Sequence, residues 1–230
     1  EFANKHNNIM YYRNNCNIRD ENLFLSLQRA HGKYVRLFND TLRFKNGALK
    51  RMLQAIESMS ESSLLLFFQN ISFINSDKKI NIYDVNQFIA NTSFYITWIG
   101  NFGIWRKNID LIQDFNRYPK MHLPQVDWYL QIVSKSDGGI LYYSDFFESI
   151  APKQKGGYNL FEVFINNYLL ILHSYLDKKI KSLILIEREK YRLFRYHILP
   201  WYLKLIIRND QSFSFDTHSA NSIIFKKYWY

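Results

Sequence analysis

The sequence predicts an α/β fold in which a mainly parallel sheet is flanked by helices and followed by a helical extension. Over residues 1–150, short apolar runs alternate with segments in which apolar residues recur at helical spacing. After Pro152 the pattern is almost entirely helical. The chain of 230 residues is 47% hydrophobic, which is enough apolar surface for a substantial core. We therefore divide the chain into an α/β part, 1–150, and a C-terminal helical extension, 151–230.

Strand and helix candidates alternate at the start of the chain. We expect strands over 9–12, 34–38 and 63–68, where aromatic and aliphatic residues predominate. We expect helices after Asp20, the candidate N-cap, and after Gly47, because apolar residues recur there every three or four positions. This order is typical of βαβ units, which build parallel sheets with helices on both faces.

The signals continue, more weakly, to the end of the α/β part. A short helix is expected over 84–90, and two strands over 94–98 and 102–105. The apolar spacing then indicates a helix over 123–134, which an Asp-Gly-Gly sequence ends. A last strand is expected over 140–143.

The C-terminal extension opens with a Gly-rich loop at 153–157 and continues as a long helical region. A basic helix is expected over 177–196, and Pro200 should interrupt or end it. Three interpretations of its Lys and Arg residues remain open. They could face an anionic membrane, contact the phosphates of nucleic acid, or form the solvated side of a helical bundle.

Charge and composition limit the function classes. The formal charge of +10 favours polyanionic partners, which include nucleic acid, an anionic membrane and phosphate-bearing substrates. The single cysteine excludes an internal disulfide and a Cys-based zinc site, so a cytoplasmic protein is expected. The sequence contains neither a GxxxxGKS phosphate loop nor a His-x3-His spacing, which weighs against kinases and zinc enzymes.

The most informative block runs from Asn22 to Leu49 and contains Ala-His-Gly-Lys-Tyr, Asn39-Asp40-Thr41 and Gly-Ala-Leu in that order. It resembles the donor half of the bacterial family 2 glycosyltransferases of the GT-A fold, in which an Asp-rich turn follows such a strand. The resemblance implies that Asp40, with Asn39 and Thr41 beside it, holds a nucleotide diphosphate directly or through Mg²⁺ or Mn²⁺. The family's Asp-x-Asp is degenerate here, and an ordinary polar turn is the alternative.

A second block, from His122 to Leu130, follows a Phe-Gly strand candidate. It resembles the acceptor half of the same family, where a helix begins near the catalytic base. Inverting transfer needs a group that removes the proton of the acceptor hydroxyl. The resemblance implies Asp127 for this role, with His122 as a second candidate. The family's Glu-Asp pair is absent, and Asp127 could instead complement the helix dipole.

Other residues have both a functional and a structural interpretation. Trp98, Trp105 and Trp128 could stack on the faces of acceptor sugars, or could belong to the core. Lys153 and Lys155 could form a lid over the donor diphosphate, or a solvated loop.

The resemblance as a whole implies a glycosyltransferase that moves a sugar from a nucleotide donor to a growing cell-surface glycan, such as capsule or lipopolysaccharide, with inversion. The acceptor would be a glycan or a lipid-linked glycan, and the protein would lie in the cytoplasm, peripheral to the inner face of the cell membrane. The family's N-terminal strand and helix, which bind the nucleoside, are not in this sequence. Either they precede residue 1 in a longer chain, or the fold differs from the one that the resemblance implies.

A non-enzymatic module is the competing interpretation, with a basic, aromatic-rich surface that binds nucleic acid or an anionic membrane. Nucleic acid is the less favoured partner, because much of the positive charge follows residue 150. The two classes differ in geometry. The transferase requires Asp40 and Asp127 at the lip of one cleft.

Overall fold

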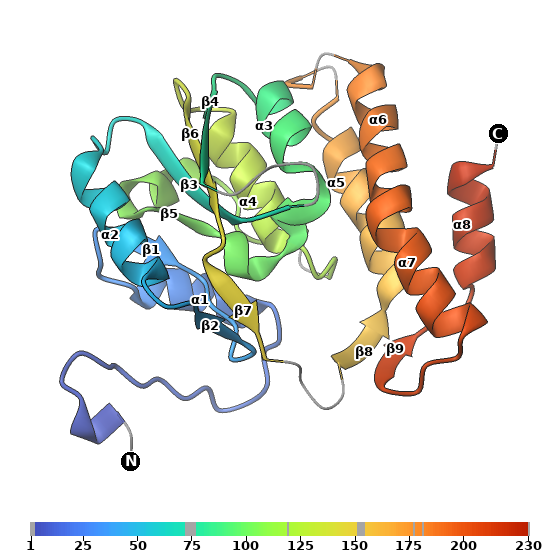
Figure 1. Cartoon of the computed structure of the whole chain (residues 1–230), viewed down its shortest axis with the longest axis horizontal. Coiled ribbons are helices and arrows are strands. Elements are labelled where there is room, and N and C mark those ends of the chain that lie inside the picture. The colour runs from blue at the N-terminus through green and yellow to red at the C-terminus, as the bar shows by residue number, and fades with distance from the viewer. Residues whose placement is uncertain are drawn as a thin grey trace.

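The computed structural model describes residues 3–71, 77–118, 120–150, 155–176, 178–180 and 182–229, except for the side chains of Asn4 and Lys155. The chain has mixed α/β structure, with helices dominating its C-terminal part (Figure 1). The α-helices are α1 Glu21–Arg29, α2 Ala48–Ser58, α3 Val85–Thr92, α4 Pro124–Val133, α5 Tyr168–His173, α6 Leu183–Leu193, α7 Leu199–Tyr202 and α8 Ala220–Tyr228.

The strands are short, and several 3₁₀ and π turns connect or extend the helices. The strands are β1 Tyr34–Arg36, β2 Leu42–Phe44, β3 Leu64–Gln69, β4 Lys78–Ile82, β5 Gly103–Trp105, β6 Gly139–Ser144, β7 Phe147–Ser149, β8 Lys155–Asn159 and β9 Phe213–Asp216. The 3₁₀ segments are η1 Ala3–Lys5, η2 Ser93–Thr97, η3 Ile99–Asn101 and η4 Arg106–Leu111. The π segments are η5 Glu162–Asn167, η6 Phe194–Ile198 and η7 Leu203–Ile207.

Strand β3 is an edge strand of the three-stranded sheet and is buried on both faces. Its side chains alternate, so that Leu64, Leu66 and Phe68 belong to the large core, whereas Leu65 and Phe67 belong to a smaller core against α2. This double burial explains why the run at 63–68 is continuously apolar rather than alternating. The predictions of this strand, of α1, α2, α3 and α4, and of β6 are confirmed.

The sheets are mixed rather than mainly parallel. In the three-stranded sheet β3 and β6 are parallel, but β4 pairs antiparallel with β6. The pairs β1–β5 and β2–β7 are antiparallel as well, whereas β8–β9 is parallel. The α/β class is therefore confirmed, but a GT-A-like parallel sheet is not.

Three local predictions fail for identifiable reasons. The run at 9–12 has no strand partner, and its apolar side chains are exposed. Residues 94–98 lie in and just after the 3₁₀ segment η2, because the chain turns at Ser93, which has φ +53°. Of the expected loop at 153–157, residues 155–157 belong to β8, which pairs with β9 from the far end of the chain, and residues 153 and 154 lie outside the described residues.

The C-terminal helices form one long rod from Leu183 to Ile207, so the helix begins later than the predicted 177. Pro200 does not end it. Proline lacks an N–H and clashes with the preceding turn, and the π turn at 194–198 shifts the hydrogen-bond register directly before it. In the described residues, none of the helices is long and apolar enough to cross a membrane.

The large core joins the α/β part to the C-terminal helices. Phe88 and Tyr129 from α3 and α4 share it with Tyr168 and Ile186 from α5 and α6. Figure 1 shows α5 and α6 beside α3 and α4, with α8 along the outer side of the helical layer. Segments on both sides of residue 150 therefore contribute to a continuous apolar interior.

Candidate functional site

A cleft of about 600 Å³ lies where the α/β part meets the C-terminal helices. Its walls come from the β1–β2 turn, from η2, from the loop before α4, and from η5 and η6. Small-molecule sites in proteins occupy roughly 300–1,000 Å³, so the cleft is large enough for a substrate. Asn39, Asp40, Thr41, Trp98 and His122, all named from the sequence, line it.

The turn 39–41 connects β1 to β2 at the edge of this cleft. The Leu42 N–H donates to the Asn39 carbonyl at 3.1 Å, and the Ile150 N–H donates to the Thr41 carbonyl at 2.7 Å, which fixes the turn. Asp40 is exposed, and no ion pair to it is seen within the described residues. The Asn39 Oδ1 atom is buried without a hydrogen-bond partner. The turn therefore offers a carboxylate and a free amide oxygen to a ligand.

His122 contacts Asp20, a residue that the sequence indicates as a helix cap. Its Nδ1 lies 3.0 Å from Oδ2 of Asp20, and both residues line the cleft. His122 has φ +58°, a conformation that costs a non-glycine residue energy and that clusters at functional sites. When the carboxylate faces Nδ1–H, Nε2 is left as the proton acceptor. The pair thus has the arrangement of a base and the acid that orients it.

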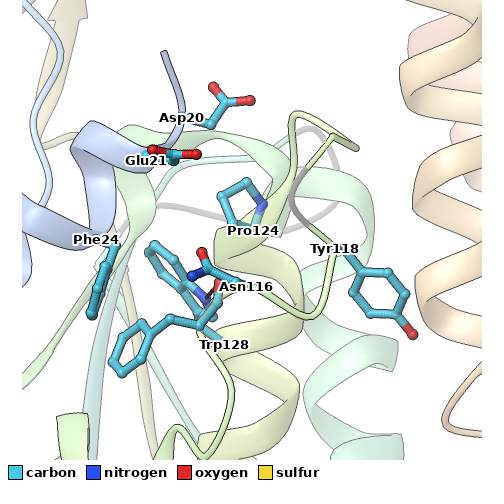
Figure 2. A pocket seen from close by; sticks show the side chains of 8 residues that line it. Asp20, Glu21, Phe24, Asn116, Tyr118, Pro124 and Trp128 are labelled. Carbon is cyan, nitrogen blue, oxygen red and sulfur yellow. Dashed lines mark hydrogen bonds between the residues drawn. The ribbon is translucent and has the colours of Figure 1, made fainter. Parts of the chain in front are cut away.

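Asp20 reaches His122 because it does not cap its own helix. It occupies the N-cap position of α1, as predicted, but its side chain makes no capping hydrogen bond. Figure 2 shows Asp20 above Pro124 and Trp128, where the start of α1 meets the start of α4. The hollow drawn there has a volume of about 10 Å³, which is room for about one water molecule.

Tyr158 from β8 packs against His122 on the cleft side. The two rings are stacked, with centroids 5.8 Å apart and planes inclined by 26°. Burial raises the pKa of Tyr158 to about 12, further above physiological pH than the value of an exposed tyrosine. The imidazole is therefore contacted both by Asp20 from the N-terminal part of the chain and by a ring from the C-terminal part.

Gln125, in the first turn of α4, carries a polar atom that the protein leaves unsatisfied. The side chain is 2% exposed, and its Nε2 donates to the Thr97 carbonyl at 2.6 Å. Its Oε1 is buried without a hydrogen-bond partner, and the residue is one of those that line the cleft. An unpaired buried acceptor costs about 1–3 kcal/mol, which a hydroxyl group of a ligand would recover.

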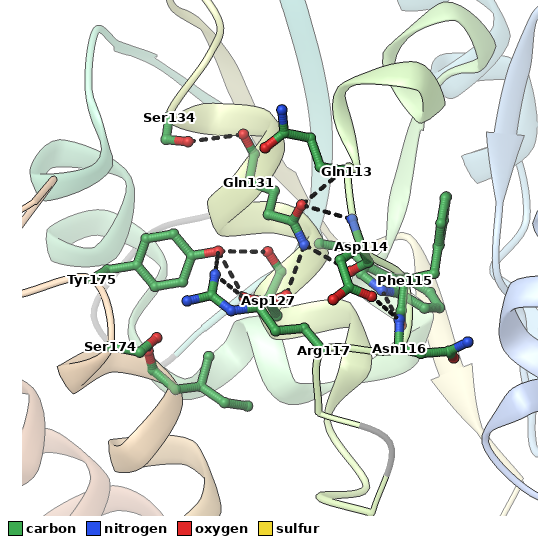
Figure 3. A network of polar contacts seen from close by, with 12 residues as sticks. Gln113, Asp114, Phe115, Asn116, Arg117, Asp127, Gln131, Ser134, Ser174 and Tyr175 are labelled. Carbon is green, nitrogen blue, oxygen red and sulfur yellow. Dashed lines mark hydrogen bonds and ion pairs between the residues drawn. The ribbon is translucent and has the colours of Figure 1, made fainter.

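Asp127 does not share the cleft with Asp40. It is 2% exposed and accepts hydrogen bonds from Tyr175 Oη and Gln131 Nε2, both at 2.7 Å. Arg117 Nη1 lies 3.6 Å from the same carboxylate (Figure 3). Burial raises the pKa of Asp127, and the hydrogen bonds from Tyr175 and Gln131, together with the positive charge of Arg117, oppose that rise.

Helical geometry accounts for the separation of Gln125 and Asp127. On a helix of 3.6 residues per turn, side chains two positions apart point about 200° away from each other. With Gln125 facing the cleft, Asp127 faces α5 and the loop at 113–117. The condition that Asp40 and Asp127 meet at one lip is therefore not met. Of the two bases named from the sequence, His122 is the one that lines the cleft.

The remaining predicted residues divide between cleft, core and undescribed segments. Trp98 lines the cleft, with its ring edge-on to Phe147 at 6.0 Å. Trp105 and Trp128 are at most 1% exposed, and their indole N–H groups donate to backbone carbonyls, so both lie in the core. Lys153 lies outside the described residues. Lys155 pairs through its backbone with Phe213, but its side chain is not described.

A buried carboxylate supports the wall of the cleft from behind. Glu189 on α6 is 1% exposed and accepts from Ser93 Oγ at 2.7 Å and from Tyr168 Oη at 2.8 Å. Burial raises the pKa of Glu189 to about 7. Ser93 directly precedes Phe94 and Tyr95, which line the cleft. Glu189 thus connects α6 to the cleft wall.

Three residues at or behind the cleft, Asp20, Gln125 and Glu189, were not named as site candidates from the sequence. In the sequence, Asp20 is the candidate N-cap of a helix, and Gln125 stands near the place where the glycosyltransferase family has its Glu-Asp pair. Glu189 lies between Arg188 and Lys190 and two residues after Glu187, so its sequence context resembles a solvated charged helix and does not indicate burial.

Comparison with known proteins adds no assignment, since no family model, curated protein or solved structure matches the chain.

Proposed function

We propose that the chain is a nucleotide-sugar-dependent glycosyltransferase and that donor and acceptor meet in the cleft between the β1–β2 turn and His122. The observation that carries the proposal is the joint placement of Asp40 and the Asp20–His122 pair on the lining of one cavity of about 600 Å³. A transferase needs a group for the leaving diphosphate and a base for the acceptor hydroxyl within reach of one sugar.

The donor side of the site is the turn 39–41. Asp40, the Asn39 amide oxygen and the Thr41 hydroxyl are hard oxygen donors, and the unpartnered Asn39 Oδ1 makes them a fit for Mg²⁺ or Mn²⁺. A divalent cation held there would stabilise the negative charge of the leaving diphosphate. No group of three or more His, Cys, Asp or Glu side chains suited to a metal gathers in the described segments, so the phosphate oxygens of the donor would complete the coordination.

The acceptor side of the site is His122. Its Nε2 removes the proton of the acceptor hydroxyl while the oxygen attacks C1 of the donor sugar from the face opposite the diphosphate. The C1–O bond breaks as the new one forms, and the nucleoside diphosphate leaves with the electron pair. Asp20 holds the imidazole and stabilises its protonated form, as the acid of a His–Asp pair does. This geometry inverts the anomeric centre.

The cleft offers two hydrogen-bond acceptors to the hydroxyl groups of a substrate and one aromatic face to a sugar ring. Gln125 Oε1 and Asn39 Oδ1 are buried and unpaired at the cleft. Trp98 presents an indole ring suited to the apolar face of a sugar. We further propose a GT-A-like arrangement of the donor half and a growing glycan, free or lipid-linked, as the acceptor.

A thermal-shift screen tests the donor side. The chain is heated with UDP, GDP, CDP or ADP, with and without Mn²⁺, since a ligand that binds only the folded state raises the unfolding temperature. We expect a shift with one of these diphosphates, and its loss in Asp40→Asn. Asp137→Asn, an exposed acid outside the cleft, is the matched control and should keep the shift.

The same screen distinguishes the transferase from the competing class, a non-enzymatic basic binding module. If no diphosphate shifts the unfolding temperature, or if Asp40→Asn and Asp137→Asn behave alike, the donor assignment fails. A basic binding module would then be the better description of the chain.

A further inference from the structure

The exposed side of the long C-terminal helical rod is unusual for a protein surface. It carries Leu183, Ile184, Tyr191, Tyr196, Leu203 and Ile207, each between 43% and 79% exposed. The opposite side of the same rod is apolar too, because Ile186, Leu193, Ile198 and Leu205 are buried in the core. A helix on the surface of a globular protein normally turns polar residues outward.

Positive charge lies among these apolar side chains. Arg188, Arg195 and Arg208 are exposed, and the only exposed acid within 182–208, all of which the structure describes, is Glu187. The carboxylate of Glu187 accepts from Lys190 Nζ at 3.0 Å, so its charge is already balanced. We call this side the outer face, defined by the six apolar residues above together with Arg188, Arg195 and Arg208.

Helix α8 extends the same composition beside the rod. Phe194 packs on Tyr228 with ring centroids 4.9 Å apart, and Tyr202 Oη donates to Asn221 Oδ1 at 2.8 Å. Phe225 and Trp229 on α8 are 58% and 75% exposed, and the basic pair at 226–227 lies between them in the sequence. Figure 1 shows α8 alongside α6 and α7 at the edge of the molecule.

We propose that the outer face docks on an anionic lipid bilayer, with the rod lying in the plane of the interface. Leu, Ile and Trp side chains enter the boundary of the acyl chains, Tyr sits at the headgroup level, and Arg binds lipid phosphates. Basic residues close to an anionic membrane each strengthen binding appreciably.

Charge and composition favour a membrane over the other possible occupants. A second copy docked by two-fold symmetry would bring the same net positive face onto itself, with Glu187 as the only exposed acid on each side. Nucleic acid would pair with the arginines but would leave the branched aliphatic side chains of Ile184 and Ile207 without a partner.

The test is co-sedimentation of the chain with vesicles, and it requires no sugar donor. Vesicles of phosphatidylcholine alone are compared with vesicles of equal parts phosphatidylcholine and phosphatidylglycerol. We expect binding to the anionic vesicles that weakens with salt. Ile184→Ser with Leu203→Ser, and separately Arg188→Gln with Arg195→Gln, should each reduce binding roughly tenfold or more.

Matched controls come from α2, which lies on the other side of the molecule from the rod (Figure 1). Leu49 and Leu53 are 49% and 48% exposed, so Leu49→Ser with Leu53→Ser removes similar apolar surface and should leave vesicle binding unchanged. Circular dichroism and the unfolding temperature check that all variants fold.

Three results would overturn the proposal. The first is that the chain binds neutral and anionic vesicles equally, or binds neither. The second is that the α2 control variant loses as much vesicle binding as the variants of the outer face. The third is a concentration-dependent dimer in analytical ultracentrifugation that Ile184→Ser with Leu203→Ser dissolves, since that would make the face an interface between copies. Transfer activity is a separate property, because the vesicle assay does not depend on the cleft.

Discussion

Asp20 Oδ2 and His122 Nδ1 lie 3.0 Å apart, and this contact joins the start of α1 to the loop that leads into α4. The carboxylate stands at the N-cap of its helix but makes no cap, so the helix gives up a stabilising hydrogen bond. His122 on the other side adopts a positive φ. The missing capping hydrogen bond and the positive φ are both locally unfavourable, and two such features at one contact are typical of functional sites.

We expect the His–Asp pair to control turnover rather than donor binding. His122→Gln should lower the release of nucleoside diphosphate by about 100- to 10,000-fold, the usual value of a general base. Asp20→Asn should cause a smaller loss, because the imidazole remains but its orientation and the stabilisation of its charged form are weakened. Steady-state rates on the donor found by thermal shift measure both effects.

Asp137→Asn is the control for the charge change at Asp20, and it should leave the rate unaltered. The unfolding-temperature shift with the diphosphate should stay close to that of the unchanged chain in both cleft variants. Full turnover in His122→Gln would remove the histidine from the mechanism.

Asp127 should contribute stability and not chemistry. Its carboxylate accepts from Tyr175 and Gln131, and asparagine offers one oxygen in place of two. Leaving a buried donor unpaired costs about 1–3 kcal/mol, so Asp127→Asn should lower the free energy of unfolding by that amount. Urea titration measures it. Turnover, assayed well below the unfolding transition, should persist, and its loss in a variant of unchanged stability would restore Asp127 as a candidate base.

We expect Trp98 to contact the ligand, and Trp105 and Trp128 to act only as core residues. Trp98→Ala should weaken substrate binding about tenfold with little change in stability, because the ring is partly exposed in the cleft. Trp105→Ala should cost about 3–5 kcal/mol of unfolding free energy, the usual effect of emptying a buried aromatic site. Isothermal titration and urea unfolding provide the two readouts. Equal effects of the two substitutions on binding would contradict the assignment.

The sequence predicted best those elements whose own pattern determines them. The continuous apolar run of β3 and the helical spacing of α2 and α4 are properties of consecutive residues, and these elements form where expected. Strand direction and partner depend on residues far away in the chain. The pairing of β8 with β9 is an example, because neither segment indicates the other.

The candidate site was predictable in its residue types but not in its contacts. The turn 39–41, Trp98 and His122 were named from the sequence, and the structure places them on one cleft. Asp127 was preferred because an acid near the start of α4 resembled a known pattern. The direction in which each residue of α4 points depends on the residue at which the helix begins, and a shift of two residues reverses the side chain's direction. The partner of His122 could not be foreseen, since Asp20 already had a plausible local role.

The buried carboxylate of Glu189 should make stability depend on pH in a direction opposite to that of a salt-bridged acid. Burial raises its pKa from 4.5 to about 7, so the folded state binds the proton more tightly than the unfolded state does. The free energy of unfolding is therefore expected to fall as the pH rises from about 4.5 to 7. The change is on the order of 3 kcal/mol, since one pKa unit corresponds to about 1.4 kcal/mol.

Glu189→Gln has no charge to bury, so its stability relative to the unchanged chain should improve between pH 5 and pH 8. Glu187→Gln, an exposed neighbour on α6, should show no such relative gain. Urea unfolding at both pH values checks the prediction, and identical pH dependence in Glu189→Gln and the unchanged chain would show that this carboxylate is not the source.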